Sequence, residues 1–126
     1  MSKILNMLMA FVMSFGISGS NVNPSDIPEN SNFEVHFIDV GQADSALIEC
    51  DGETMMIDGG NVADSNVVAA YLKKEDVTEL NYVVCSHAHE DHVGGLSGAL
   101  SVTKADNIYA PKTKANTKAY KNFKKK

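Results

Sequence analysis

The sequence contains no arginine, no histidine after His92 and no acidic residue after Asp106. All eleven basic residues are therefore lysines, and seven of them lie between Lys112 and Lys126. Residues 1–111 carry four lysines and sixteen acidic residues, a net charge of −12, whereas the last fifteen residues carry +7. The overall charge of −5 thus hides an acidic body and a basic C-terminal segment.

The basic segment "TKANTKAYKNFKKK" has two interpretations. A basic tail is typical of contacts with nucleic acid or an anionic membrane. Alternatively, the segment is a surface helix with a solvated lysine face, and Ala119, Tyr120 and Phe123 form its inward side. The helical spacing of these apolar residues favours the surface helix.

The chain also lacks a long hydrophobic run. The longest apolar stretch, Ile4–Ile17, is too short for a stable membrane span, and small residues follow it at Ser18–Ser20. This pattern is typical of a signal peptide over residues 1–20, which predicts a secreted or cell-envelope protein. Residues 21–32, with two prolines, are predicted to form a linker. An N-terminal amphipathic helix that packs on the domain stays open as an alternative.

The remaining composition predicts one small globular domain over residues 33–126. The chain has 126 residues, of which 44% are hydrophobic and 21% charged. With only two cysteines, Cys50 and Cys85, at the ends of predicted strands, two buried thiols are favoured over an oxidised pair. An oxidised pair stays open if the chain is exported.

Strand and helix patterns alternate from Phe33 onward. The stretches "FEVHFIDV", "DSALIEC" and "ETMMIDGG" predict three antiparallel strands in a meander. A helix over "SNVVAAYLKKEDV", a buried strand "ELNYVVCS", a helix from near Gly94, a strand "NIYAP" and a last helix follow. The order β-β-β-α-β-α-β-α predicts an α/β layered domain, which usually places its site at strand ends.

The stretch "CSHAHEDHVGGL" has the residue types of a metal site. His87 and His89 are two residues apart, so their imidazoles are expected on one side of an extended segment. Asp91 and His92 add a carboxylate and a third imidazole, a set that suits zinc or a mixed zinc, iron or manganese pair. His36 stands alone in a strand pattern and is not predicted to be a ligand.

Two motifs resemble a known family. "HAHEDHVGG" resembles the H-x-H-x-D-H signature of the metallo-β-lactamase superfamily. "FIDVGQADSALIECDGETMMIDGG" resembles the opening of its branch related to the ComEC competence proteins. The resemblance covers about Phe33 to Lys124. It implies an αββα sandwich, of which this chain supplies the first half, and a hydrolase whose two Zn²⁺ ions, or other divalent metals, activate a bridging water.

The resemblance also implies roles for single residues. His87 and His89 correspond to ligands of the first metal ion, and Asp91 and His92 to ligands of the second, with Asp91 also counted as catalytic. Asp58, at the end of the third strand, corresponds to an acidic residue beneath the metals that orients a ligand.

The first loop of the branch motif corresponds to the edge of the site. Asp39, Gln42 and Asp44 are the residues that match there. The branch usually has glycine where this chain has Ala43. If that turn needs a positive φ, alanine costs roughly 1 kcal/mol.

The later ligands of the family are missing. The complete site needs a further histidine, a bridging aspartate and a last histidine, but no histidine follows His92. Asp106 is the only later acidic residue, and its position predicts the start of a strand. We therefore expect the N-terminal part of a longer enzyme, with this chain inactive alone. The alternative is a short, non-catalytic, secreted module that binds metal or another protein.

The branch favours a phosphodiester substrate, with extracellular DNA as one example. Small-molecule substrates of the superfamily, such as lactones and thioesters, stay open, whereas the branch motif disfavours β-lactams.

Overall fold

The computed structural model describes residues 32–125. The predicted signal peptide, all of the predicted linker except Asn32, and Lys126 lie outside the described residues. Within the described range, no helix has the length and apolar character that a membrane crossing requires.

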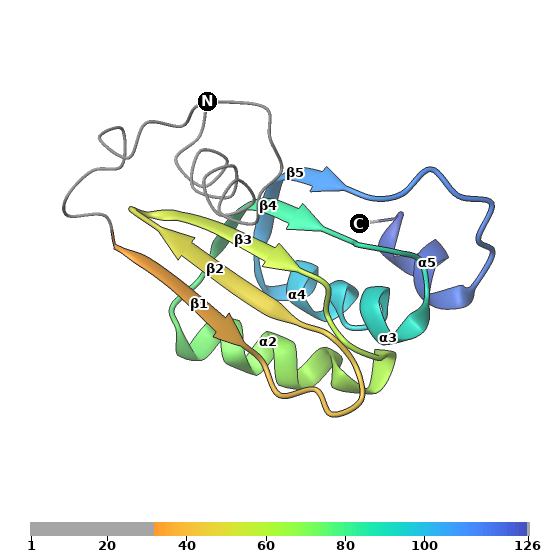
Figure 1. The fold of residues 1–126 in the computed structure, drawn as a ribbon, viewed down its shortest axis with the longest axis horizontal. Coiled ribbons are helices and arrows are strands. Elements are labelled where there is room, and N and C mark those ends of the chain that lie inside the picture. The colour runs from red at the N-terminus through yellow and green to blue at the C-terminus, as the bar shows by residue number, and fades with distance from the viewer. Residues whose placement is uncertain (1–31, 126) are drawn as a thin grey trace, which may run out of the picture.

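The elements follow the predicted order, with two short additions (Figure 1). A single 3-10 turn, η2, precedes the first long helix, and a four-residue helix, α3, precedes α4. The elements are β1 (Phe33–Phe37), β2 (Ala46–Cys50), β3 (Glu53–Ile57), η2 (Val62–Asp64), α2 (Ser65–Lys74), β4 (Glu79–Val84), α3 (Glu90–Val93), α4 (Leu96–Val102), β5 (Lys104–Tyr109) and α5 (Lys118–Phe123).

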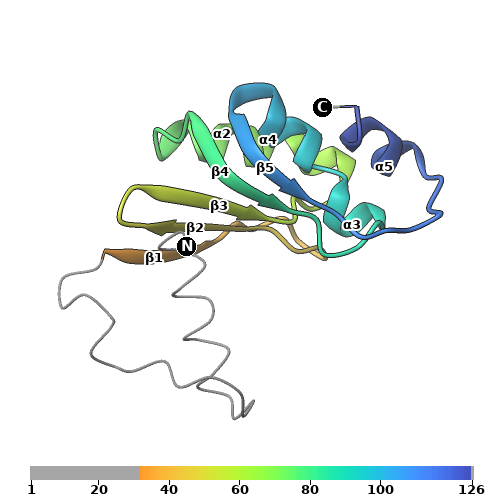
Figure 2. The same cartoon turned by 90° about the horizontal axis from the view of Figure 1, so that it is seen from above.

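The five strands form one sheet in the order β1-β2-β3-β4-β5. Strands β1, β2 and β3 are antiparallel neighbours, so the predicted meander is confirmed. Strands β4 and β5 then add in parallel, each after a crossover through helix. Figure 2 shows α2 and α4 on one side of the sheet, which makes the domain the mixed α/β layered fold that the sequence predicts.

The core lies between this helical layer and the sheet. On the sheet, Leu47 pairs with Met56, Met56 pairs with Val83, and all three side chains are fully buried. On α2, Val68 and Leu72 are four residues apart, so they lie on one face of the helix and are also fully buried. Burial of each such side chain stabilises the fold by about 1.5–3 kcal/mol.

The other face of the sheet is apolar but is not covered by any helix that the structure describes (Figure 2). Ile48, Cys50 and Met55 form a small buried cluster there. Around them Val35 is 41% exposed and Phe37 is 85% exposed. This face therefore combines a small buried cluster with exposed apolar side chains on β1.

Part of the C-terminal lysine-rich segment, Lys118–Phe123, forms a surface helix, whereas residues 113–117, which were also predicted to be helical, have no regular secondary structure. The Thr117 hydroxyl caps α5 by accepting a hydrogen bond from the Tyr120 amide, at 3.2 Å. Ala119, Tyr120 and Phe123 are buried in the main core, as their spacing predicts. Their burial confirms that this part of the basic segment is folded onto the domain.

Candidate metal centre

The site forms at the edge of the sheet where strands β3 and β4 end. The two strands are parallel, so Asp58, after β3, and Ser86, after β4, leave the sheet side by side. The Cys85 amide donates to the carbonyl of Tyr109, at the end of β5. The histidine motif therefore starts at the carboxyl edge of three parallel strands.

Three side chains of the motif bring donor atoms together. His87, Asp91 and His92 each place one nitrogen or oxygen within 4.8 Å of the other two, and all three residues are half-buried. The ring centroids of His87 and His92 are 3.7 Å apart, and His92 Nε2 lies 3.6 Å from Asp91 Oδ2. Two imidazoles and a carboxylate therefore converge on one small volume.

His89 lies beside this group but outside it. Its ring centroid is 4.8 Å from that of His87, with the rings edge to face. His89 is exposed and is the N-cap residue of α3, where the chain turns from extended to helical backbone. Of the four predicted ligands, the fold thus gathers three and keeps the fourth adjacent to His87.

Asp58 provides a buried carboxylate at the site and is only 3% exposed. Its Oδ1 accepts a hydrogen bond from the Ser86 amide, and its Oδ2 accepts from the Ser86 hydroxyl. The same Oδ2 lies 2.8 Å from His92 Nδ1. A carboxylate in this position favours the tautomer with its proton on Nδ1, which leaves the Nε2 lone pair facing Asp91.

Ser86 was not predicted as a site residue. Its hydroxyl lies 3.2 Å from His87 Nδ1 and 3.3 Å from His92 Nδ1, in addition to its bond with Asp58. A serine between a strand and a metal motif carries no distinctive sequence signal, because only the fold brings Asp58 to it.

The loop between β1 and β2 reaches the site through Asp44. Asp44 Oδ2 lies 3.7 Å from His92 Nε2, and the Asp44 amide donates to the Asp91 carbonyl. Asp44 is therefore at the site edge, where the sequence placed it. Asp39 is exposed and accepts a hydrogen bond from the Gly41 amide, and Gln42 is exposed.

The strain considered for Ala43 does not occur. Gly41 supplies the positive φ of this loop, +65°. Ala43 is not among the described non-glycine residues with a positive φ, which are Asp51, Asp58 and Asp76. Alanine is accommodated because the turn needs its left-handed residue two positions earlier.

A pair of glycines fits the motif against the neighbouring loop. The Gly95 amide donates to the Gly60 carbonyl, and the Gly59 amide donates to the His92 carbonyl at 2.7 Å. A Cβ atom on Gly95 would lie 1.9 Å from the Gly59 carbonyl oxygen. Backbone segments therefore approach each other closely at Gly94 and Gly95, and α4 begins directly after them.

Comparison with known proteins agrees with this geometry. The family model described as the metallo-beta-lactamase superfamily matches residues 38–120. The chain belongs to the metallo-β-lactamase superfamily. A crystal structure of the metallo-β-lactamase SMB-1 bound to 2-mercaptoethanesulfonate is similar, with 25% sequence identity and a TM-score of 0.52. That match covers 64% of this chain and 33% of the other, so this chain spans about a third of its solved neighbour. A search of curated proteins gave no match.

The donor set fits the divalent metal that this superfamily typically binds. Neutral imidazole nitrogens and a carboxylate oxygen are ligands of zinc and of the related transition metals. Asp106 does not add to the set, because it lies within β5 and accepts a hydrogen bond from Asn81 at 3.2 Å. The described residues after His92 therefore bring no further imidazole or carboxylate to the site.

Cys85 is next to the motif but has the properties of a structural thiol. It is buried, and its Sγ donates to the His87 carbonyl at 3.1 Å. Burial, and then the negative charge of Asp58, raise the pKa of Cys85 to about 11, although the backbone contact at His87 acts in the opposite direction. Cys50 and Cys85 are both buried and are not joined by a disulfide, as the preferred interpretation of the sequence predicted.

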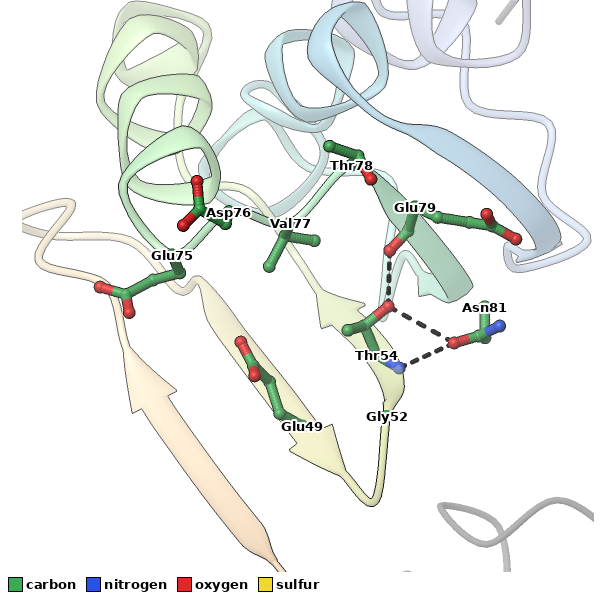
Figure 3. Close-up of a pocket in the computed structure, with 9 residues that line it drawn as sticks. All are labelled: Glu49, Gly52, Thr54, Glu75, Asp76, Val77, Thr78, Glu79 and Asn81. Atoms are coloured by element: carbon green, nitrogen blue, oxygen red, sulfur yellow. Dashed lines mark hydrogen bonds between the residues drawn. The ribbon is translucent and has the colours of Figure 1, made fainter.

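A separate pocket of about 360 Å³ lies at the opposite end of the same strands (Figure 3). Thr54 and Glu79, from the starts of β3 and β4, meet there through a bond from Thr54 Oγ1 to the Glu79 carbonyl. Four acidic residues line the pocket together with polar groups: Glu49, Glu75, Asp76 and Glu79. Its negative charge disfavours an anionic substrate there.

Proposed function

We propose that this chain supplies part of the dinuclear zinc site of a hydrolase that cleaves phosphodiesters. The convergence of His87, Asp91 and His92 over a buried Asp58 is the observation that supports it. Bound zinc would supply Lewis acidity and hydroxide at neutral pH. His87 and His89 would hold one ion, and Asp91 and His92 the other.

The chain's own residues prepare this site before any ion binds. Asp58 favours the His92 tautomer with its proton on Nδ1, and the Ser86 hydroxyl bridges the carboxylate to both histidines. Hydrogen bonds from Gly59 to His92 and from Asp44 to Asp91 fix the backbone on both sides. A preorganised ligand set lowers the free energy cost of ordering side chains when metal binds.

The substrate class rests on the resemblance of "FIDVGQADS" to the ComEC-like branch. We propose a phosphodiester such as DNA, outside the cytoplasm if residues 1–20 act as a signal peptide. We further propose that the remaining ligands come from residues beyond Lys126 in a longer protein. This agrees with the lack of any histidine after His92.

Zinc titration by isothermal calorimetry tests the site. We expect binding to the full chain and at least about tenfold weaker binding in His92→Ala and Asp91→Asn. His36→Ala is the matched control, because His36 lies on β1 and contacts Tyr71 rather than the motif. Equal zinc affinity in all three variants and the parent chain would refute the assignment.

Sequencing the gene downstream of Lys126, in the same reading frame, tests whether this chain is part of a longer protein. We expect further histidines and an aspartate, and a full product that hydrolyses bis(p-nitrophenyl) phosphate in a zinc-dependent manner. A stop codon directly after Lys126 would instead favour the second candidate, a non-catalytic metal-binding module. The observation in favour of that candidate is the incomplete ligand set of this chain.

A further inference from the structure

The lysines of the C-terminal segment form a basic surface on the described domain. Six of the nine described lysines lie within fourteen residues, and all six are exposed. We call this group the lysine surface: Lys112, Lys114, Lys118, Lys121, Lys124 and Lys125. Ala119, Tyr120 and Phe123 fill the inward side of α5, so its two lysines, Lys118 and Lys121, lie on its exposed side, and the other four flank the helix.

The fold holds this surface next to the metal centre. The segment leaves β5 at Tyr109. The Tyr109 carbonyl accepts a hydrogen bond from the amide of Cys85, at the start of the histidine motif. Helix α5 then packs against α3, the helix that carries Asp91 and His92 (Figures 1 and 2). The Tyr120 hydroxyl donates to the Pro111 carbonyl at 2.8 Å, which ties the loop back onto α5.

The positive charge of the surface is not neutralised within the described part of the chain. None of the six lysines forms an ion pair there, whereas Lys74 pairs with Glu75 at 2.9 Å. The other described lysines, Lys73, Lys74 and Lys104, lie at the end of α2 and the start of β5. Uncompensated charge costs stability through repulsion among the lysines, so an external anion would stabilise this segment.

We propose that the lysine surface binds the phosphate backbone of a nucleic acid and holds it beside the metal centre. This inference rests on the proposed phosphodiesterase function. Lysine ammonium groups contact phosphates as point charges and carry no sequence information. The aromatic residues of α5 are buried, so they offer no platform for stacking on bases. Binding is therefore independent of base sequence and strongly dependent on salt.

Fluorescence anisotropy with a labelled DNA duplex tests the inference. The full chain is titrated in EDTA, so neither metal nor turnover contributes. The variant Lys114→Gln/Lys118→Gln/Lys121→Gln is compared with Lys73→Gln/Lys74→Gln/Lys104→Gln, which removes the same charge elsewhere. We expect affinity to fall at least about tenfold in the first variant only, and the slope of log K against log salt to shrink by about 2–3.

Two outcomes would overturn the inference. The first is an equal loss of affinity in both triple variants, which indicates a general charge effect. The second is tighter, lysine-dependent binding to phosphatidylserine vesicles than to DNA, which assigns the surface to a membrane. A Lys→Arg version of the first triple keeps the charge and should keep DNA binding. Unfolding midpoints confirm that each variant is folded.

The same variants separate this inference from the proposed function. Hydrolysis of bis(p-nitrophenyl) phosphate by the longer protein needs the metal centre but no polyanion contact. Loss of DNA binding with intact hydrolysis supports the lysine surface. Intact DNA binding without any hydrolysis contradicts the proposed function alone.

Discussion

At the scale of single residues, Asp58 has the most demanding position in the site. Its backbone has a positive φ of +55°, and its carboxylate is buried against Ser86 and His92. Aspartate and asparagine tolerate left-handed backbone better than most residues, and a buried carboxylate needs several donors. Asp58 tolerates the positive φ, and Ser86 and His92 provide hydrogen-bond partners for its carboxylate, so an aspartate is suited to this position.

The first prediction concerns Asp58→Asn, which keeps the shape and the backbone preference. The amide replaces one acceptor oxygen by a donor, so either Ser86 or His92 loses its partner. We expect zinc affinity to fall about 10–100-fold and the free energy of unfolding to fall by about 1–3 kcal/mol. Calorimetry and urea unfolding measure these changes.

The control for that substitution is Asp76→Asn. Asp76 has the same φ, +55°, but is exposed at the end of α2. The Asp76→Asn substitution should leave zinc affinity unchanged. If both variants lose zinc affinity equally, the loss is a general effect of removing a carboxylate charge and not a specific role of Asp58.

The second prediction concerns the two thiols. Cys50 and Cys85 are 1% and 3% exposed, and the raised pKa of Cys85, about 11, keeps that thiol uncharged at neutral pH. We expect iodoacetamide at about pH 8 to leave both unmodified in the native chain and to label both in urea. Mass spectrometry counts the labels. Rapid labelling of the native chain would show that the sheet opens locally.

At the scale of elements, the contact between two glycine-containing loops determines where the motif lies. Gly59 and Gly60 follow β3, whereas Gly94 and Gly95 connect α3 to α4, and their backbones touch. Backbones approach this closely only without Cβ atoms. Helix α3 is therefore positioned by packing against the β3 loop, rather than by its own four residues.

The third prediction follows from this contact. In Gly95→Ala the new methyl group would lie 1.9 Å from a backbone oxygen that cannot move without displacing Asp58. We expect the free energy of unfolding to fall by about 3 kcal/mol. Gly52→Ala, in the turn between β2 and β3, meets no atom within 4 Å but has φ +86°, so it should cost about 1–2 kcal/mol. Equal losses in urea unfolding would contradict the steric explanation.

At the scale of the whole molecule, helices cover one apolar face of the sheet, whereas no described helix covers the other face, where Val35 and Phe37 are exposed beside a small buried cluster. The helical layer covers Leu47 and Met56, while Val35 and Phe37 on β1 are exposed on the other side. Exposed apolar surface on an edge strand favours association with other chains. Covering exposed apolar side chains stabilises an assembly by roughly 25 cal/mol per Å² of apolar surface removed from water.

The fourth prediction is that the chain self-associates through this face. We expect Val35→Thr/Phe37→Thr to lower the fraction of large species in sedimentation velocity, since threonine keeps the strand propensity and reduces apolar area. Val62→Thr/Val67→Thr is the control, because these valines are 49% and 47% exposed on the helical side. A similar drop in both variants would mean that general hydrophobicity, not this face, causes association.

The amino-acid sequence by itself determined the element order, the inward side of α5 and the identity of the metal motif. These features depend on local periodicity and on residue types within short stretches, as at Ala119, Tyr120 and Phe123. Only the tertiary structure decided that Asp58 and Ser86 meet His92, and that His89 stays outside the group formed by His87 and Asp91. Parallel pairing of β3 with β4 brings Asp58 across twenty-eight positions to Ser86, and the turn into α3 redirects His89. Contacts between distant segments depend on strand pairing and backbone packing, which no local pattern contains.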